Sequence, residues 1–254
     1  MPATPSSEQK RGSLAPAVHI VFSRPPQAVS EEQYDRWHET HVAQARQAPE
    51  FAAAARYALV SALDEPAEPD RFTRAAVYEI DVPAREASAA VAARLSSGHP
   101  DVPDWFGEVR VSSWLAHPLG QRIERGVTGA TNVRQSLQLV FSDAGDADHP
   151  VSDESFDGWY ERHLDEILSI PGFSSAQRYR LEELTRPADG TIPGRRLCIY
   201  MTTKPPDELR AEMERMDLLS ADSYSRLKDT DSTGPALPEW WDRVRFASWN
   251  LIPL

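Results

Sequence analysis

The sequence predicts an α+β protein built from two copies of one unit of strands and helices. Residues 34–59 align with residues 156–181 at a constant offset of 122 positions, and ten of the twenty-six aligned pairs are identical. His41 and His163 form one of these pairs. A period of this length indicates a duplicated domain, because the repeats of solenoid proteins span only roughly 20–50 residues.

The repeat extends beyond this segment in both directions. Residues 21–23 (Val-Phe-Ser) recur as residues 140–142, and the pattern of residues 105–114 recurs over 240–249. The offset is 135 at the second of these places, so the second copy holds thirteen additional residues. We place them in the segment 220–238, which is long enough to form either a lid or an irregular excursion.

Domain boundaries follow from the repeat and from local composition. The first sixteen residues are rich in Pro, Ser and Ala and lack the apolar run of a signal peptide, which predicts a disordered tail. We expect a first domain over 17–119, a polar linker over 120–134 and a second domain over 135–254. Each domain, at about 115 residues, is large enough to bury a core of its own.

Composition excludes several classes of function. The net charge of −12 disfavours nucleic acid and anionic membrane surfaces as partners. No stretch approaches the roughly 18 apolar residues of a membrane span, and no glycine-rich phosphate loop is present. The single cysteine, Cys198, rules out an internal disulfide and favours a cytoplasmic location.

The first copy predicts six elements in order. Residues 17–23 are rich in Val and Ile and are followed by two prolines, which is typical of a strand. Ser30 has the position of a helix N-cap, with Gln33 completing a capping box, and predicts a helix to about Ala48. The other elements are strands over 51–63 and 72–82, a helix from Pro83 to about Gly98, and a strand over 108–116.

The second copy predicts the same order. Its strands cover 135–142, 173–184, 195–203 and 243–251, and its helices run from Ser152 to about Ile170 and from Pro205 to about Leu219. The order of strand, helix, strand, strand, helix, strand is that of a ferredoxin-like βαββαβ unit. Because each unit has an apolar sheet face to cover, we expect the two sheets to pack together.

Two histidines are the candidate catalytic residues. The first helix carries a stripe of Tyr34, Trp37, His41, Ala45 and Ala48 at the spacing of one buried face. His163 has the place of His41 in the second copy. Imidazole is the side chain best suited to move protons near neutral pH, although a structural role is the alternative.

The surroundings of these histidines suggest a ligand site. In both copies an aromatic residue precedes the histidine by seven positions, a tryptophan precedes it by four, and an arginine follows it by fifteen. Such groups would line an apolar pocket and offer a cation to a developing oxyanion. The candidate substrate-binding residues are Tyr34, Trp37, His38, Arg56, Phe156, Trp159, Tyr160 and Arg178.

We expect neither a metal nor another cofactor. His38 and His41 with Glu39 between them suggest a metal pair, but their spacing places the imidazoles on neighbouring rather than identical helix faces. The second copy also has Tyr160 in place of His38.

These motifs resemble the EthD-like branch of the dimeric α/β-barrel superfamily. The resemblance rests on Trp37, Glu39 and His41 of the first helix and on the Arg-Tyr pair at 56–57, all of which recur in the second copy. In that superfamily two ferredoxin-like units form a barrel, usually as a homodimer, with the helix histidine facing a pocket between helices and sheet. The resemblance implies an intramolecular pseudo-dimer here, alone or within a further homodimer.

The resemblance and the residues together predict a cofactor-independent enzyme of catabolism. It would act as an isomerase, cyclase, dehydratase or lyase on a hydrophobic, aromatic or carbonyl-bearing substrate, through histidine acid–base chemistry. One alternative is a non-catalytic ligand-binding or accessory barrel, and another is a cofactor-free monooxygenase or a haem enzyme. We expect the two sites to differ, with the His41 half roomier because Ala45 and Ala48 replace Ile167 and Ile170.

Overall fold

The computed structural model describes residues 16–61, 71–96, 102–125, 135–144, 149–185, 195–216 and 238–254. The predicted tail up to residue 15, the linker from 126 onward and the inserted segment before Pro238 lie outside the described residues.

Both halves have the predicted order of elements. The first half contains β1 (Val18–Arg24), α1 (Glu31–Ala45), β2 (Phe51–Ser61), β3 (Arg74–Ile80), α2 (Ala84–Ser96), the short 3-10 helix η1 (Asp104–Glu108) and β4 (Arg110–Glu124). The second half contains β5 (Ser136–Ala144), α3 (Asp153–Ile167), β6 (Phe173–Thr185), β7 (Arg196–Thr202), α4 (Pro206–Arg215), the 3-10 helix η2 (Trp241–Arg243) and β8 (Val244–Pro253).

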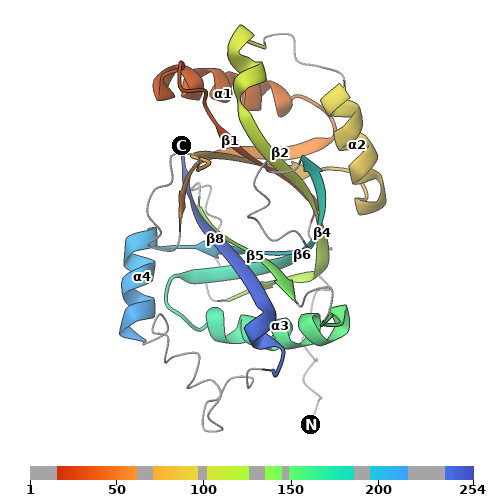
Figure 1. Ribbon diagram of the computed structural model, residues 1–254, viewed down its shortest axis with the longest axis vertical. Coiled ribbons are helices and arrows are strands. Elements are labelled where there is room, and N and C mark those ends of the chain that lie inside the picture. The colour runs from red at the N-terminus through yellow and green to blue at the C-terminus, as the bar shows by residue number, and fades with distance from the viewer. Residues whose placement is uncertain are drawn as a thin grey trace, which may run out of the picture.

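The eight strands form one closed barrel in the order β1-β3-β2-β8-β5-β7-β6-β4, and all neighbours are antiparallel. Each half contributes four adjacent strands, so the halves meet at two seams, β2 with β8 and β4 with β6. Helices α1 and α2 lie outside the first half of the barrel, and α3 and α4 lie outside the second (Figure 1). The predicted fold class is confirmed: two ferredoxin-like units are paired as an intramolecular α/β barrel.

Several boundaries differ from the prediction by a few residues, and that of β4 differs most. Strand β4 continues to Glu124, into the segment predicted as linker, because it pairs with β6 as far as Glu124 opposite Ser175. Gly120 has a φ of +72° at the register shift within this pairing, a conformation that glycine adopts without a steric penalty. Helix α1 ends at Ala45, three residues before the predicted end.

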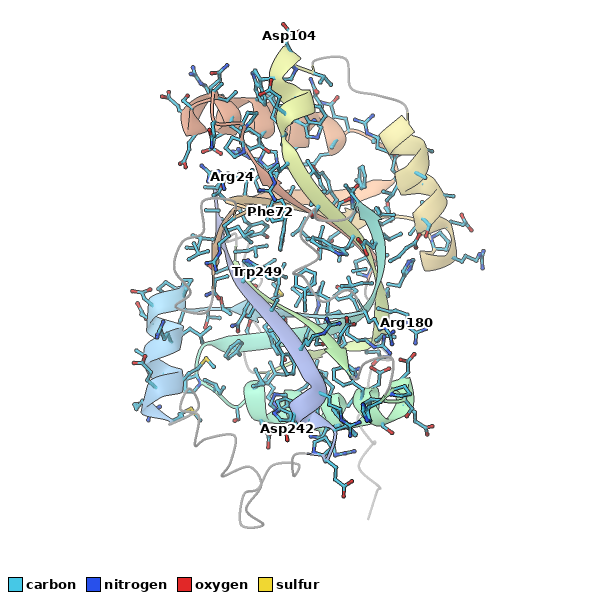
Figure 2. All side chains as sticks on the ribbon, viewed as in Figure 1. Arg24, Phe72, Asp104, Arg180, Asp242 and Trp249 are labelled. Carbon is cyan, nitrogen blue, oxygen red and sulfur yellow. The ribbon has the colours of Figure 1, made fainter. Side chains whose placement is uncertain are left out.

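The barrel interior is a packed core shared by both halves. Phe22 and Trp114 of the first half contact Phe141 and Trp249 of the second, with ring centroids 5.1–5.8 Å apart and several edge-on arrangements. Figure 2 shows side chains filling the space between the two half-sheets, with Trp249 labelled there. Because this interior is occupied by side chains, the candidate sites lie outside it, between each half-sheet and its helices.

The shared core makes a prediction about stability. Trp114 is only 1% exposed, so Trp114→Ala removes buried aromatic surface and leaves a cavity, which costs about 3–5 kcal/mol. Urea unfolding followed by circular dichroism and by tryptophan fluorescence should show one common transition at a lower midpoint. Val60→Ala, at an exposed position, is the control and should change stability by less than about 0.5 kcal/mol. Two separate transitions would contradict the shared core.

Candidate functional site

Helix α1 presents His38, rather than His41, to the sheet. The Ser30 side chain caps the helix by accepting from the backbone N–H of Gln33, and the buried residues are Tyr34, His38, Val42 and Ala45. The predicted stripe was therefore wrong in phase at two positions, since Trp37 and His41 are only half-buried. Tyr34 sets the phase because its hydroxyl donates to the Ser23 Oγ of β1 at 2.7 Å, which brings the residues at i+4 and i+8 over the sheet.

His41 and His163 occupy equivalent places at the edge of their helices. The ring of His41 stacks on Trp37 with centroids 5.0 Å apart, and the ring of His163 stacks on Trp159 at 4.8 Å. His163 Nδ1 also lies 2.8 Å from a carboxylate oxygen of Glu166 on the same helix. Each histidine thus contacts the tryptophan one turn earlier, and neither is fully buried.

Aromatic residues of the 3-10 helices cover these tryptophans. In the first half, Trp37 contacts Trp105 and Phe106 with centroids 5.3 Å away in both cases. In the second half, Trp159 contacts Trp241 at 4.6 Å and Trp240 at 6.0 Å. Trp105 reaches the buried face as well, since its ring lies 5.9 Å from that of Tyr34.

The predicted site arginine of the first half fixes α1 to the sheet. Arg56 Nη1 donates to the backbone carbonyl of Asp35 at 2.8 Å, and its Nη2 lies 3.7 Å from Glu39. Arg74 of β3 donates to both carboxylate oxygens of Asp35, at 2.6 and 2.9 Å, and holds the pKa of that carboxyl below its usual range. Two cations from neighbouring strands therefore bind one aspartate of the helix.

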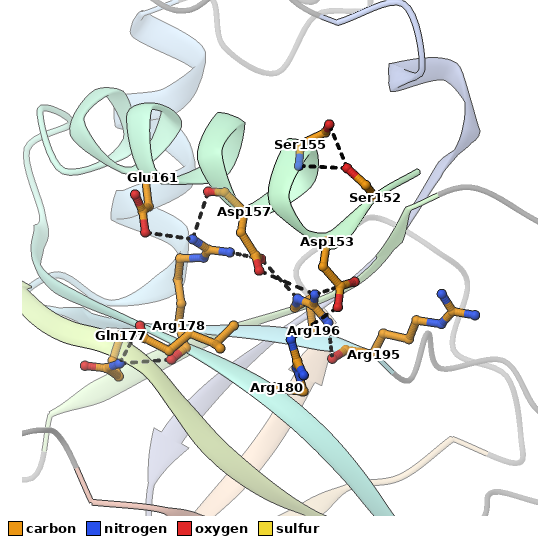
Figure 3. Close-up of polar contacts among 11 residues, drawn as sticks. Ser152, Asp153, Ser155, Asp157, Glu161, Gln177, Arg178, Arg180, Arg195 and Arg196 are labelled. Atoms are coloured by element: carbon orange, nitrogen blue, oxygen red, sulfur yellow. Dashed lines mark hydrogen bonds and ion pairs between the residues drawn. The ribbon is translucent and has the colours of Figure 1, made fainter. Parts of the chain in front are cut away.

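The second half repeats this network (Figure 3). Arg178 donates to the backbone carbonyl of Asp157 at 2.9 Å and to its carboxylate, while Arg196 donates to the same carboxylate and pairs with Asp153 at 2.7 Å. Arg178 also lies over the ring of Tyr160, 5.1 Å from its centroid. We did not expect this Asp–Arg clamp from the sequence, although its members recur at the offset of 122.

The space between the first half-sheet and α1, here called the first-half layer, contains two buried histidines. His38 is 4% exposed and its ring lies 5.4 Å from that of Tyr34. His19 of β1 is 5% exposed and stacks on Tyr78 of β3 at 5.6 Å. Within the part of the chain that the structure describes, His19 Nε2 and His38 Nδ1 are buried and have no hydrogen-bond partner. Buried polar groups are rarely left so, and a ligand contact is one explanation.

Sequence reasoning missed His19. The signal was the alternation of strand β1, in which Val18, Ile20 and Phe22 belong to the barrel core, so that His19 must face the helices.

Burial keeps these groups uncharged. Desolvation lowers the pKa of His38 to about 3, with the nearby charge of Arg56 as the second cause, and desolvation lowers the pKa of His19 to about 4. Burial also raises the pKa of Tyr34 to about 12. At neutral pH the first-half layer therefore holds two neutral imidazoles, each with one donor and one acceptor nitrogen, and a protonated phenol.

The second half satisfies its polar groups internally at the two positions that correspond to His38 and His19. Tyr160 replaces His38, and its hydroxyl lies 3.3 Å from that of Tyr200. Gln138 replaces His19 and donates to Ser248 at 3.3 Å. Cys198 is buried beside them, and burial raises the pKa of its thiol to about 12, which leaves it unreactive.

The two layers also differ in side-chain size. The buried apolar cluster of the first includes Val42, Ala45, Ala76, Ala87 and Val91. The cluster of the second includes Leu164, Leu168, Ile170, Phe173 and Leu209.

The described ranges contain neither a cluster of metal-binding side chains nor a helix that could span a membrane. No group of three or more His, Cys, Asp and Glu side chains there is arranged to hold a metal ion. His38 is buried while its neighbour Glu39 is exposed, so these two do not converge. No helix in the described ranges is both long and apolar enough to cross a membrane.

Comparisons with known proteins find only distant structural similarity. No protein-family model and no curated protein matches the chain. Similar solved structures include a monooxygenase candidate from Fusobacterium nucleatum, with 8% identity, 94% of this chain and 93% of that chain covered, and a TM-score of 0.46. An anthrone oxidase-like protein (12% identity, 94% and 92% covered, TM-score 0.40) and a chlorite dismutase candidate (10%, 94% and 95%, 0.42) are also similar. All three TM-scores are below 0.5, so the fold assignment rests on the strand order described above.

The buried histidines predict a pH dependence of stability. Between the ordinary histidine pKa of 6.5 and the lowered values, the unfolded chain binds protons that the folded chain excludes. The free energy of unfolding should therefore fall as the pH falls below 6.5, by up to about 1.4 kcal/mol per pH unit for each histidine. Above pH 6.5 these two histidines do not make the free energy of unfolding depend on pH.

The second copy supplies the substitutions for this test. In the double variant His19→Gln, His38→Tyr, urea unfolding between pH 7 and pH 5 should show a shallower loss of stability than the wild type. His117→Gln, a half-exposed histidine at the β4–β6 seam, is the matched control. Equal slopes in the double variant and the wild type would mean that the folded protein protonates both histidines normally.

Proposed function

We propose that the first-half layer binds a small hydrophobic molecule with a carbonyl or phenol group and that His38 moves a proton on it. The observation that carries this proposal is the unpartnered Nδ1 of a neutral, buried imidazole in a layer built of small side chains. An apolar site with few polar groups is typical of small-molecule binding. The reaction would be an isomerisation, cyclisation, dehydration or carbon–carbon lysis without a cofactor.

The low pKa of His38 limits the conditions under which this residue can accept a proton. An isolated positive charge on this imidazole is unfavourable, so His38 accepts a proton only when a negative charge forms beside it. Removal of a proton from carbon next to a carbonyl does this, since the electron pair of the C–H bond moves onto the oxygen as an enolate. The ion pair then collapses when His38 returns the proton to another carbon or to a leaving group.

Neighbouring groups have supporting roles in this proposal. The Tyr34 hydroxyl, one helical turn before His38, donates its proton to Ser23, so it would stabilise the enolate oxygen only by exchanging that hydrogen bond for one to the ligand. Arg56 acts as a positioning residue through the Asp35 carbonyl, since its guanidinium already has that partner. His41 and Trp37 would contact the ligand at the edge of the helix. The acid–base role that the sequence suggested for His41 and His163 thus passes to His38.

Hydrogen exchange tests the proton transfer before the substrate is known. Wild-type protein in D₂O should catalyse incorporation of deuterium next to the carbonyl of some members of a panel of cyclic ketones, lactones and acetophenones, as followed by NMR. His38→Gln should slow this exchange roughly a hundredfold or more, as expected for loss of a general acid–base group. Its melting temperature should change little, because the substitution replaces one buried, uncharged polar group by another.

Two comparison variants locate the site. His117→Gln should exchange at the wild-type rate, since His117 lies at the β4–β6 seam beside Glu182. His163→Gln should have a small effect, and a loss confined to it would place the reaction in the second half instead. Unchanged exchange in His38→Gln would remove His38 from the chemistry.

The same samples separate the other candidate functions. A non-catalytic binding protein would bind panel members in calorimetry without catalysing exchange. A cofactor-free monooxygenase would consume oxygen together with the bound compound, which an oxygen electrode measures.

A further inference from the structure

The two unpartnered nitrogens of the first-half layer lie on opposite walls. His38 belongs to the helix and His19 to the sheet, and both side chains are at least 95% buried. At the equivalent positions the second copy has Tyr160 and Gln138, whose polar atoms find partners within the protein. The first copy therefore leaves a polar group unsatisfied on each wall of the same layer.

The distance between His19 and His38 along the layer can be estimated from the rise per residue of a strand and of a helix. Tyr34 reaches Ser23 near the end of β1, and Val42 and Ala45 cluster with Ala17 before its start, so α1 runs back along the strand. Four strand residues from Ser23 to His19 span roughly 13 Å. Four helix residues from Tyr34 to His38 span about 6 Å. His19 thus lies on the order of 7 Å beyond His38 along the layer.

The charges around the layer favour an uncharged ligand. Both arginines near His38 have partners, because Arg56 donates to the Asp35 carbonyl and Arg74 to the Asp35 carboxylate. Both imidazoles are neutral, so neither these histidines nor the two arginines bound to Asp35 offer an uncommitted positive charge to a bound carboxylate or phosphate. Burying an anion there would be costly.

We propose that His19 is a specificity-determining residue, and that the ligand is an uncharged molecule with a hydrogen-bonding group at each end, one held by His38 and the other by His19. The separation corresponds to a molecule about one six-membered ring long between its polar ends. Tyr34 lies beside His38 and Tyr78 stacks on His19, so each end of the ligand would meet aromatic surface. This inference rests on the site of the proposed function, but it concerns binding rather than turnover.

Calorimetry with four related probes tests the inference. Para-hydroxyacetophenone has two neutral polar ends, phenol and acetophenone have one each, and para-hydroxybenzoate has a charged end. The wild type should bind para-hydroxyacetophenone about tenfold more tightly than either one-ended probe, as expected for one additional buried hydrogen bond. It should bind para-hydroxybenzoate more weakly than para-hydroxyacetophenone.

Substitutions at His19 show whether this residue makes the second contact. His19→Leu should remove the preference for the two-ended probe while leaving the affinity for the one-ended probes within about twofold. His19→Gln should keep part of the preference, since its amide also donates and accepts. Gln138→Leu, at the equivalent position of the second copy, is the matched control and should keep all of it.

Each result decides between the inference and a specific alternative. Equal preference in His19→Leu and the wild type would show that His19 is structural only, and tighter binding of para-hydroxybenzoate would overturn the neutral ligand class. Failure of all four probes to bind would mean that water alone occupies the layer, and would overturn the inference. If the preference follows His19 but no compound undergoes exchange or turnover, the binding inference stands and the proposed catalysis fails.

Discussion

The constraint on which the structure depends is the second face of each half-sheet. Four strands with two helices on one side leave an apolar face and two unpaired edges, and neither is stable in water. The other copy covers both, because β2 pairs with β8, β4 pairs with β6, and the facing side chains form one core around Phe22, Trp114, Phe141 and Trp249. A core of this kind fills the barrel with side chains. The duplication that stabilises the fold therefore also moves the available sites outward, to the layers beneath the helices.

Those layers need a fixed helix, and the Asp–Arg clamps provide one. In each copy two guanidinium groups from neighbouring strands bind one aspartate, through its backbone carbonyl and its carboxylate, and this restrains both the rotation and the position of the helix. Buried ion pairs contribute little net stability as a rule, but they penalise other arrangements. Asp35 and Asp157 lie between the residues that face the sheet, Tyr34 with His38 and Phe156 with Tyr160. The clamp thus determines which side chains enter each layer, and it explains why Arg56 and Arg178 recur in both copies without serving as free cations.

Most of the fold was accessible from the sequence, whereas the site was accessible only in part. The repeat, the strand patterns and the caps at Ser30 and Ser152 predicted the element order, since these are local signals. The phase of α1 was not predicted, because Tyr34, Trp37, His38 and His41 are all partly apolar and spacing alone allows either stripe. A tertiary contact, the hydrogen bond from Tyr34 to Ser23, decides between them. The extension of β4 also depends on its partner strand in the other copy.

The comparison between copies separates structural from functional features within one chain. Both copies keep the clamp, the tryptophan–histidine stack and the aromatic cover from the 3-10 helix, so these features belong to the architecture. The positions of His38 and His19 both differ between the copies. In the second copy, both positions carry side chains that form hydrogen bonds within the protein. In the first copy, each position carries an imidazole with one nitrogen that lacks a partner. Leaving two buried polar atoms unsatisfied opposes stability, typically by 1–3 kcal/mol each. A partner that is absent from the folded chain itself would offset this, and the pairing of the two changes in one layer is what a single ligand contacting both walls would require.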